Sequence, residues 1–456
     1  MNSKHVANKT LVTLSIAITL IAIGCGSDRP NLVIISLDTV RADHLGTYGY
    51  HRGTSPRLDA LASSGVVFER AYTIAPNTGP SHSTMLTGLP PHLHGARTNG
   101  TSVNADVTTL AEILRDSGYS TGAFVSGAPM RSEISGLDRG FEHYEDDFPA
   151  ARRSAESVMA LAKGWLARRL ANPYFLFIHL YDAHGPYLPS SKYAALFPAG
   201  GASGRVGTIP DYQKVGDRQG RVDLRLENYI ARYDAVLRYL DDQLASLLAE
   251  IDLRNTLVIV TSDHGETLGE RHWNLDHGAQ LFDEQLRIPL ILHGPGLEPT
   301  RSAAQVDTLD FVPTILEYLE LPDDPGVAGH GRSLLPLISK QLSIPDRPLF
   351  ASGRSISQRH RDRGYELNSK FRTLSVRSDG WKLIRYPGMH GRITELYDLE
   401  ADPGEIKNLA SQKPEIRDRY LELIERERSA AIERIEDPML SPNQKRKLKA
   451  LGYIEP

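Results

Sequence analysis

The chain of 456 residues contains short, continuously apolar runs that alternate with helical patterns. Five of these runs read as buried strands, at residues 31–37 (NLVIISL), 174–180 (YFLFIHL), 256–262 (TLVIVTS), 288–293 (IPLILH) and 121–126. Strands of a parallel sheet that is covered on both faces have this uninterrupted apolar character. Helical patterns lie between them, at 55–64, 107–116, 155–168 and 226–250. The alternation predicts an α/β fold with a large, mostly parallel sheet and helices on both faces.

Polar residues directly follow three of the predicted strands. Asp38 follows the first, Asp182 and His184 follow the run at 174–180, and Asp263 and His264 follow the run at 256–262. In open α/β sheets, ligands bind beyond the carboxyl ends of the strands. We therefore expect these side chains to meet at one edge of the sheet and to form a ligand site there.

The residue types at this edge suit a metal ion. Asp38, Asp263 and His264 supply two carboxylates and an imidazole, and the hydroxyl of Thr78 could add a fourth ligand. Oxygen and nitrogen ligands without a thiolate favour Zn²⁺ or Mn²⁺, whereas an all-oxygen shell is typical of Ca²⁺ or Mg²⁺. The alternative is that Asp38 caps the following turn and His264 is a buried structural histidine. We predict one or two divalent ions at this edge.

Thr78 precedes Gly-Pro-Ser and a helix-like run. A hydroxyl at a helix N-terminus lies beside unpaired backbone N–H groups and the positive end of the helix dipole, which together favour a bound anion. A metal ion that touches this oxygen would stabilise its alkoxide. Thr78 is therefore a candidate nucleophile toward an anionic ester, and the simpler alternative is a helix-capping threonine.

The N-terminal segment has the charge layout of an export signal. Lys4, His5 and Lys9 precede an apolar run at 11–24, which is shorter than the roughly 20 residues of a spanning helix and stops at Cys25. The sequence AIGC at 22–25 resembles the lipobox of bacterial lipoproteins, which implies cleavage before Cys25 and lipidation of its thiol. A plain secretory signal is the alternative. We expect an exported protein, anchored by its lipid to the outer membrane or the periplasmic face of the envelope.

Composition excludes one class of partner. Apolar residues make up 40% of the chain and charged residues 24%, and the formal net charge is −4. This balance supports a large folded core, and the chain lacks the basic surface that nucleic-acid binding requires. We expect no nucleic-acid partner.

Five motifs lie between about residue 30 and residue 410. They are NLVIISLDTVRAD at 31–43, SPRLDALASSGVVFERAY at 55–72, TGPSHSTMLTG at 78–88, TSDHGE at 261–266 and ELYDLEADPGE at 395–405. Together they resemble the motifs of the sulfatase family in the alkaline phosphatase superfamily. The resemblance implies a catalytic α/β domain at 30–345 after the signal at 1–25. It also implies a smaller α+β subdomain at 346–456, where we expect a β-hairpin and a charged helix at 414–436.

The sequence departs from the sulfatase pattern at the nucleophile. Sulfatases carry Cys or Ser at the position of Thr78 and oxidise it to formylglycine, whereas threonine would give a ketone. Thr39 replaces a second Asp of the family, and His82 replaces an Arg. Threonine nucleophiles belong to related phosphodiesterases and phosphoethanolamine transferases, which implies chemistry on phosphorus.

Four further residues are candidates for substrate contacts. His184, in HGPY at 184–187, resembles a transferase histidine that binds substrate or a second zinc, and His277 lies where those enzymes place another. Asn99 resembles a substrate-binding asparagine of phosphonate ester hydrolases, although Asn-Gly is also a common turn. His82 lies one helical turn from Thr78 and could face the anion or pack against the helix.

These assignments predict a metal-dependent phosphoester hydrolase. Thr78 attacks the phosphorus of a mono- or diester, and water cleaves the phospho-threonine. The alternatives are a sulfatase that works without formylglycine, a phosphoryl transferase, and a non-catalytic lipoprotein that binds anionic glycans. The leaving group could be a sugar, a lipid headgroup, a nucleotide or an aryl alcohol.

Overall fold

The computed structural model describes residues 29–427, apart from 150, 169–172, 201–203, 208, 216–221, 272–274, 324–328, 340–345, 355–364 and 369–370. The predicted signal and Cys25 lie outside the described residues, as do residues 428–436 of the predicted charged helix. Among the helices that are described, none is both long and apolar enough to cross a bilayer.

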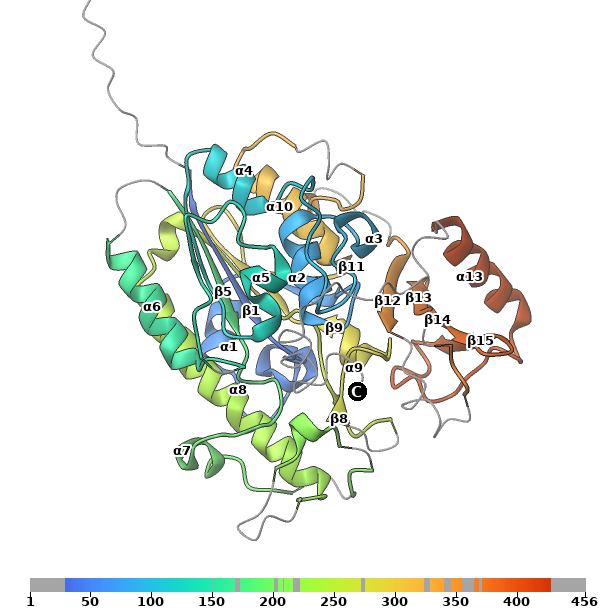
Figure 1. Cartoon of the computed structure of the whole chain (residues 1–456). Helices are drawn as coiled ribbons and strands as arrows, with labels where there is room; N and C mark the ends of the chain where they lie inside the picture. Colours follow the sequence, from blue (N-terminus) through green and yellow to red (C-terminus); the bar gives the residue numbers. More distant parts are fainter. Residues whose placement is uncertain are drawn as a thin grey trace, which may run out of the picture.

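A large twisted sheet forms the centre of the molecule (Figure 1). Its strands follow the order β11-β2-β10-β6-β1-β5-β3-β4, with β9 paired to β2. The bounds are β1 Asn31–Leu37, β2 Val66–Tyr72, β3 Ser120–Phe124, β4 His143–Glu145, β5 Tyr174–Leu180, β6 Thr256–Thr261, β9 Arg287–Ile288, β10 Leu290–His293 and β11 Thr300–Asp307. The predicted α/β class is confirmed, and β1 lies between β5 and β6, parallel to both.

One predicted strand has the opposite direction. β10 runs antiparallel to β6 and β2, although its apolar run resembles the parallel strands. An apolar run reports that both faces of a strand are covered, and it carries no information on strand direction. The prediction of a parallel strand at 288–293 was therefore wrong in direction, while its burial was right.

Helices cover both faces of this sheet. On β1, Val33 and Ile35 pack toward α1, α6 and α8, whereas Leu32 and Ile34 pack toward α2, α4 and α10. The alternation follows from the two-residue period of a strand. The helix bounds are α1 Pro56–Ser63, α2 Thr78–Thr87, α3 Pro91–His94, α4 Leu110–Asp116, α5 Ser132–Ser135, α6 Ala155–Arg168, α7 Ser191–Ala194, α8 Leu226–Leu248, α9 Asp283–Leu286, α10 Phe311–Tyr318 and α11 Leu335–Ile338.

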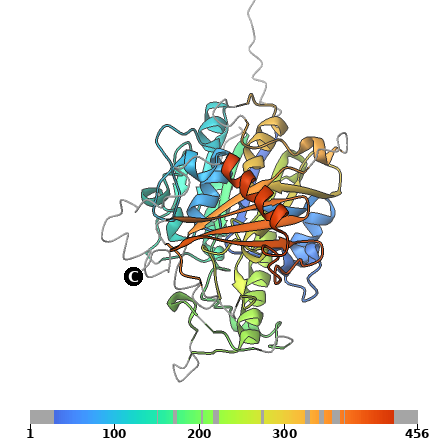
Figure 2. The same ribbon diagram turned by 90° about the vertical axis from the view of Figure 1, so that its right-hand side faces the viewer.

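A second, antiparallel sheet lies beside the large domain, with α13 on its outer face (Figure 2). Its strands are β12 Leu349–Arg354, β13 Arg372–Ser378, β14 Trp381–Gly388 and β15 Gly391–Asp398, and α13 spans Pro414–Glu427. Asp379 and Gly380, with φ angles of 44° and 75°, form the turn between β13 and β14. Two positive φ values are typical of a tight hairpin turn, so the predicted hairpin is confirmed. The strands β7 Thr267–Leu268 and β8 Leu275–Asp276 form a separate, small antiparallel pair.

The second sheet touches the loops that follow the large sheet. The backbone N–H of Ser352 on β12 donates to the Ile74 carbonyl at 2.9 Å, and that of Arg354 donates to the Gly278 carbonyl at 3.3 Å. Ile74 precedes α2, and Gly278 follows His277. The end of β12 therefore lies against the two segments that carry Thr78 and His277.

Candidate active site

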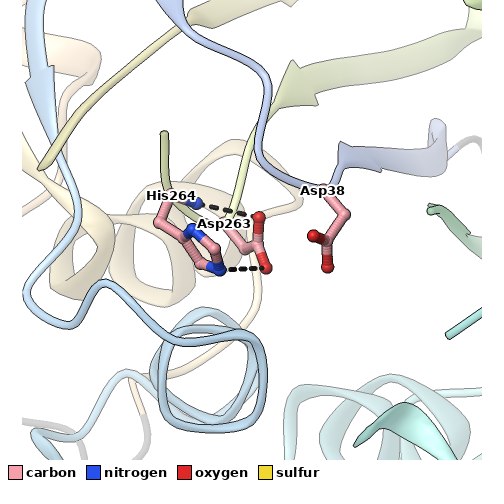
Figure 3. Close-up of side chains that lie close together, drawn as sticks. All are labelled: Asp38, Asp263 and His264. Atoms are coloured by element: carbon pink, nitrogen blue, oxygen red, sulfur yellow. Dashed lines mark hydrogen bonds and ion pairs between the residues drawn. The ribbon is translucent and has the colours of Figure 1, made fainter. Parts of the chain in front are cut away.

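Three predicted ligands meet beyond the ends of β1 and β6. Asp38 follows β1, Asp263 and His264 follow β6, and all three are fully buried. One ligand atom from each lies within 4.8 Å of the others, and Figure 3 shows the carboxylates facing one another beside the imidazole. Parallel pairing of β1 with β6 produces this contact, because it brings the two carboxyl ends to the same edge.

The donor atoms of this cluster suit a cation. Within the described part of the chain, Asp38 Oδ1, Asp263 Oδ2 and His264 Nε2 are buried without a hydrogen-bond partner, and the last two of these atoms lie 3.4 Å apart. His264 Nδ1 donates to the Gly265 carbonyl at 2.9 Å, which leaves the lone pair on Nε2 for a ligand. Burial and then the charge of Asp263 raise the pKa of Asp38 well above its ordinary value. A cation between the two carboxylates would remove this repulsion.

The turn after β1 fixes Asp263. Thr39 adopts a left-handed conformation with φ of 58°, and its backbone N–H donates to Asp263 Oδ1 at 3.1 Å. The N–H of His264 donates to the same oxygen at 2.8 Å. These two bonds hold Oδ1 and leave Oδ2 facing the cluster. The hydroxyl of Thr39 donates to the Asp38 carbonyl at 2.7 Å, so this side chain is turned to the backbone.

Thr78 is the first residue of α2, and Asn77 takes the capping position in extended conformation. The Thr78 hydroxyl is fully buried and donates to Asp38 Oδ2 at 3.3 Å. The alternative of a capping threonine is therefore wrong, and the structure brings Thr78 to the three metal-ligand candidates. All four predicted members of the cluster lie together.

Asn99 lies against the N-terminus of α2. Its Oδ1 accepts from the backbone N–H of Gly79 at 2.7 Å, while its Nδ2 is buried and has no hydrogen-bond partner among the described residues. A Cβ on Gly79 would lie 3.3 Å from that Oδ1, so glycine permits the close approach. Asn99 thus has an unused amide donor beside Thr78, which fits the predicted contact with an anion.

Two further histidines form hydrogen bonds to residues of the cluster. His82 Nδ1 donates to the Thr78 carbonyl at 2.8 Å and its Nε2 accepts from Ser36 Oγ at 2.8 Å, so both ring nitrogens have protein partners. This geometry favours the packing alternative for His82 over the predicted substrate contact. His179 Nε2 donates to Asp38 Oδ2 at 3.1 Å. Sequence reasoning missed His179, although an imidazole inside the apolar run at 174–180 was a signal.

His184 and His277 lie beside His264. Their ring centroids are 4.9 Å apart, and that of His277 lies 4.7 Å from that of His264. His184 Nδ1 donates to the Gly185 carbonyl at 2.9 Å and the ring stacks on Tyr181. Burial and then the charge of His277 lower the pKa of His184 well below its ordinary value, which keeps the imidazole neutral near pH 7.

Glu266 is a second residue that sequence reasoning left without a role. It is fully buried, and its Oε1 lies 3.2 Å from His277 Nδ1 while its Oε2 accepts from Gln213 Nε2 at 3.0 Å. The carboxylate therefore orients His277. Glu266 stands in the TSDHGE segment at 261–266, so its place two residues after His264 was the available signal.

Asp182 was predicted at the same edge, but the structure turns it elsewhere. Its Oδ2 accepts from the N–H of Ala155, the first residue of α6, at 2.9 Å. Burial raises the pKa of this carboxyl to about 6, against the opposing charge of Arg152. A carboxylate satisfies the free N–H groups at a helix N-terminus, so Asp182 binds α6 and does not join the predicted ligand site.

Comparison with protein families gives matches along most of the chain. Residues 30–321 match the family described as Sulfatase, and residues 269–429 match the family described as N-sulphoglucosamine sulphohydrolase, C-terminal. A Delta 4,5-hexuronate-2-O-sulfatase of Bacteroides thetaiotaomicron is 26% identical over 84% of this chain and 85% of its own length. The Arylsulfatase K of Homo sapiens is 26% identical over 89% of this chain and 84% of its own.

Solved structures share the fold. The phosphonate monoester hydrolase of Agrobacterium radiobacter superimposes with a TM-score of 0.71 and 23% identity, over 89% of this chain and 96% of that chain. A protein in complex with its substrate D-glucosamine-2-N,6-O-disulfate gives a TM-score of 0.72 and 20% identity, over 88% and 97% of the two chains. At these identities the likeness concerns the arrangement of the two sheets and their helices.

Proposed function

The chain belongs to the sulfatase family of ester hydrolases, and from that premise we propose a metal-dependent hydrolase of anionic esters that uses Thr78 as its nucleophile. The observation that carries the proposal is the contact between the Thr78 hydroxyl and Asp38, 3.3 Å apart, beside three buried ligand atoms that lack hydrogen-bond partners in the described chain. No helix-capping or core-packing role accounts for all three of these atoms. Asp38, Asp263 and His264 would hold the ion.

When bound, a divalent cation supplies positive charge next to the Thr78 oxygen and to the oxyanion of the ester. Asp38 Oδ2 accepts the hydroxyl proton of Thr78 in a hydrogen bond, which directs the oxygen lone pairs away from the carboxylate. Thr78 Oγ1 forms a bond to phosphorus while the bond to the leaving oxygen breaks, and the alcohol departs with a proton. Water then cleaves the phospho-threonine and restores the hydroxyl.

Side chains around Thr78 stabilise the charge that develops. Asn99 Nδ2 donates to one equatorial oxygen, because its Oδ1 is already fixed by Gly79. The imidazole of His277 lies beside those of His264 and His184. Because His184 is neutral and its Nδ1 donates to the Gly185 carbonyl, its Nε2 presents a lone pair, which would suit a second metal ion rather than an oxyanion. Donors that are fixed before the reaction stabilise a transition state without reorganisation, and removal of one such donor typically costs about 10²- to 10³-fold in rate.

Threonine at the nucleophile favours phosphorus esters. A sulfated threonine would lack the aldehyde hydrate through which sulfatases expel sulfate, whereas a phosphorylated threonine is open to attack by water. The second candidate is a sulfuric ester hydrolase, which the names of the relatives favour. Those names and the disulfated glucosamine bound by a structural relative also favour an anionic glycan as the natural substrate.

The test compares p-nitrophenyl phosphate, phosphodiester, phosphonate and sulfate esters on protein purified with zinc or manganese. We expect phosphorus esters to be the better substrates, and Thr78→Ala to abolish turnover and phosphoenzyme formation while metal content is kept. Thr78→Ser is the matched control, since it retains the hydroxyl and should form the phosphoenzyme. Undiminished turnover in Thr78→Ala would contradict the mechanism, and a preference for the sulfate ester would favour the second candidate.

A further inference from the structure

His179 places an imidazole on an otherwise apolar face of β5, beside Asp38. Phe175, Phe177 and His179 alternate along this strand, so their side chains point to the same face of the sheet. The two phenylalanines belong to the core that lies between this face and α2. Parallel pairing of β1 with β5 puts His179 opposite Ser36, two residues before Asp38. The sheet therefore brings the imidazole to the carboxylate.

The two carboxylate oxygens of Asp38 have different surroundings. Oδ2 accepts a hydrogen bond from His179 Nε2 at 3.1 Å and another from the Thr78 hydroxyl at 3.3 Å. Oδ1 is buried and has no hydrogen-bond partner among the described residues, as is also true of Asp263 Oδ2 and His264 Nε2. His179 thus holds one oxygen beside the Thr78 hydroxyl, and the other oxygen is left for a cation.

The surroundings of His179 fix its tautomer. A carboxylate accepts hydrogen bonds and does not donate them, so Nε2 of His179 carries a proton. Nδ1 is buried without a partner in the part of the chain that the structure describes, so a proton on it would have no acceptor. A buried polar atom without a partner typically costs about 1–3 kcal/mol. The bond to Asp38 is therefore the contact that accounts for an imidazole at this core position.

Packing holds the ring of His179 in this orientation. Its centroid lies 4.8 Å from that of His82, and the two ring planes are 78° apart. A Cβ on Gly127 would lie 3.0 Å from Cε1 of His179, so the glycine leaves just enough room for the ring. The carbonyl of His179 accepts from Ser126 Oγ at 2.8 Å. A donor fixed in this way restricts rotation of the Asp38 carboxylate.

We propose that His179 is a positioning residue that sets the choice of metal ion, because it holds Asp38 Oδ2 and directs Oδ1 alone to the cation. This inference rests on the proposed function, since it takes a cation to bind at Asp38, Asp263 and His264. Ca²⁺ takes about six to eight oxygen ligands and often binds both oxygens of a carboxylate, whereas Zn²⁺ is most often four-coordinate. A carboxylate that offers one oxygen therefore favours Zn²⁺ over Ca²⁺.

The test compares His179→Phe with His179→Gln. Phenylalanine fills the space of the imidazole and removes the donor, whereas the amide nitrogen of glutamine can take the place of Nε2 and restore it. Competition with a chelating dye gives the dissociation constants of the metal-free proteins for Zn²⁺ and for Ca²⁺. We expect His179→Phe to bind Zn²⁺ about 10- to 100-fold more weakly, as after the loss of other partners of metal ligands, and to keep its affinity for Ca²⁺. His179→Gln should regain most of the Zn²⁺ affinity.

Two further variants guard against a purely structural effect. His179→Asn has an amide too short to reach Asp38, and it should reproduce the change in His179→Phe if the latter fails to fold. His94→Phe is the matched control, because it removes another buried imidazole, which binds Thr84 and the N–H of Ala96 outside the cluster. It should leave the ratio of Zn²⁺ to Ca²⁺ affinity as in the wild type. Thermal unfolding of the metal-free proteins shows which variants are folded.

The outcomes separate this inference from the proposed function. An unchanged ratio of Zn²⁺ to Ca²⁺ affinity in the folded His179→Phe or His179→Asn protein would overturn the role of His179 alone. A loss in His179→Gln as large as that in His179→Phe would do the same. Absence of binding of both ions by the wild type would overturn the metal site of the proposed function, and the role of His179 with it.

Discussion

Two clusters of carboxylates in this chain, one fully buried and one partly buried, are compensated in different ways. At the active site, Asp38 and Asp263 face each other, and one oxygen of each has no hydrogen-bond partner in the described residues. Between the large domain and the second sheet, Asp283 binds Arg377 at 2.7 Å and Lys382 at 2.8 Å. The second cluster carries its own cations, and Arg377 and Lys382 hold the pKa of Asp283 well below its ordinary value against the effect of burial.

The difference indicates what each cluster does. A buried carboxylate is tolerated when a cation and hydrogen bonds satisfy it. Asp283 meets this condition within the protein and joins two parts of the molecule, so its role is structural. Under the proposed function, an ion from outside would meet it for Asp38 and Asp263, and the metal-free site would then lower the stability of the fold. Substitution at the two clusters should therefore affect different properties.

The largest effect is expected from Asp263→Asn. The asparagine Oδ1 can keep the hydrogen bonds from Thr39 and His264, while its amide nitrogen replaces the oxygen that faces the cluster. We expect loss of bound metal and a fall in kcat/KM of about 10³-fold or more, since the ion supplies charge in the transition state. Elemental analysis and turnover of the best aryl ester would measure this.

The same variant tests whether the two facing carboxylates lower the free energy of unfolding of the metal-free protein. Because a repulsion between two buried carboxylates is removed, the metal-free variant should have a free energy of unfolding equal to or above that of the metal-free wild type. Denaturant titration in the presence of a chelator would measure it. Full metal content in the variant, or a large decrease in the free energy of unfolding of the metal-free variant, would contradict the difference in role between the two clusters.

Asp283→Asn should produce the opposite pattern. Lys382, which is 1% exposed, and Arg377 would lose a charged partner, and a broken buried ion pair typically costs about 3 kcal/mol. We expect a lower free energy of unfolding in denaturant titration with metal content unchanged. Asp379→Asn is the matched control, because its pair with Arg419 is exposed and should contribute well under about 1 kcal/mol. Equal decreases in the free energy of unfolding of both variants would contradict the structural role of Asp283.

The smallest effect concerns Glu405, the less compensated carboxyl of the same network. Burial raises its pKa from 4.5 to about 7, with Lys382 opposing and Asp283 adding to the rise. Between pH 4.5 and 7, the carboxyl of Glu405 therefore keeps its proton in the folded protein and loses it in the unfolded chain. The contribution of this group to the free energy of unfolding is complete below pH 4.5 and decreases as the pH rises to 7.

Glu405→Gln should remove this decrease. Glutamine resembles the protonated carboxyl, so the variant should match the wild type near pH 4.5 and exceed its free energy of unfolding by about 2 kcal/mol at pH 6, with a further rise toward pH 8. Denaturant titrations at several pH values would give the difference. A difference that is independent of pH would show that Glu405 is ionised in the folded protein throughout this range.

Most of the candidate metal site could be predicted from the sequence. Asp38, Asp263 and His264 follow apolar runs directly, and a parallel sheet brings the ends of such runs together. Thr78 was found through its place before a helix. The direction of β10 could not be predicted, because burial on both faces looks the same in either direction.

Side-chain direction set the limit of prediction within the site. Asp182 and His82 have suitable chemistry and suitable positions, but one binds the first turn of α6 and the other spans Thr78 and Ser36. His179 and Glu266 act through hydrogen bonds to other site residues, which no local pattern reveals.

The central place of β1 has a consequence for the order of events during synthesis. β1 is the first strand to leave the ribosome, yet Leu32 pairs with Phe175 on one side and Leu257 on the other. The strand that carries Asp38 therefore stays unpaired until residue 180 of 456 has been made, and it gains its second neighbour only at residue 261, past the middle of the chain. Contacts of such long range are associated with slow folding and with exposure to aggregation. We expect the nascent chain to depend on a holding chaperone, and metal-binding capacity to arise only after β6 is complete.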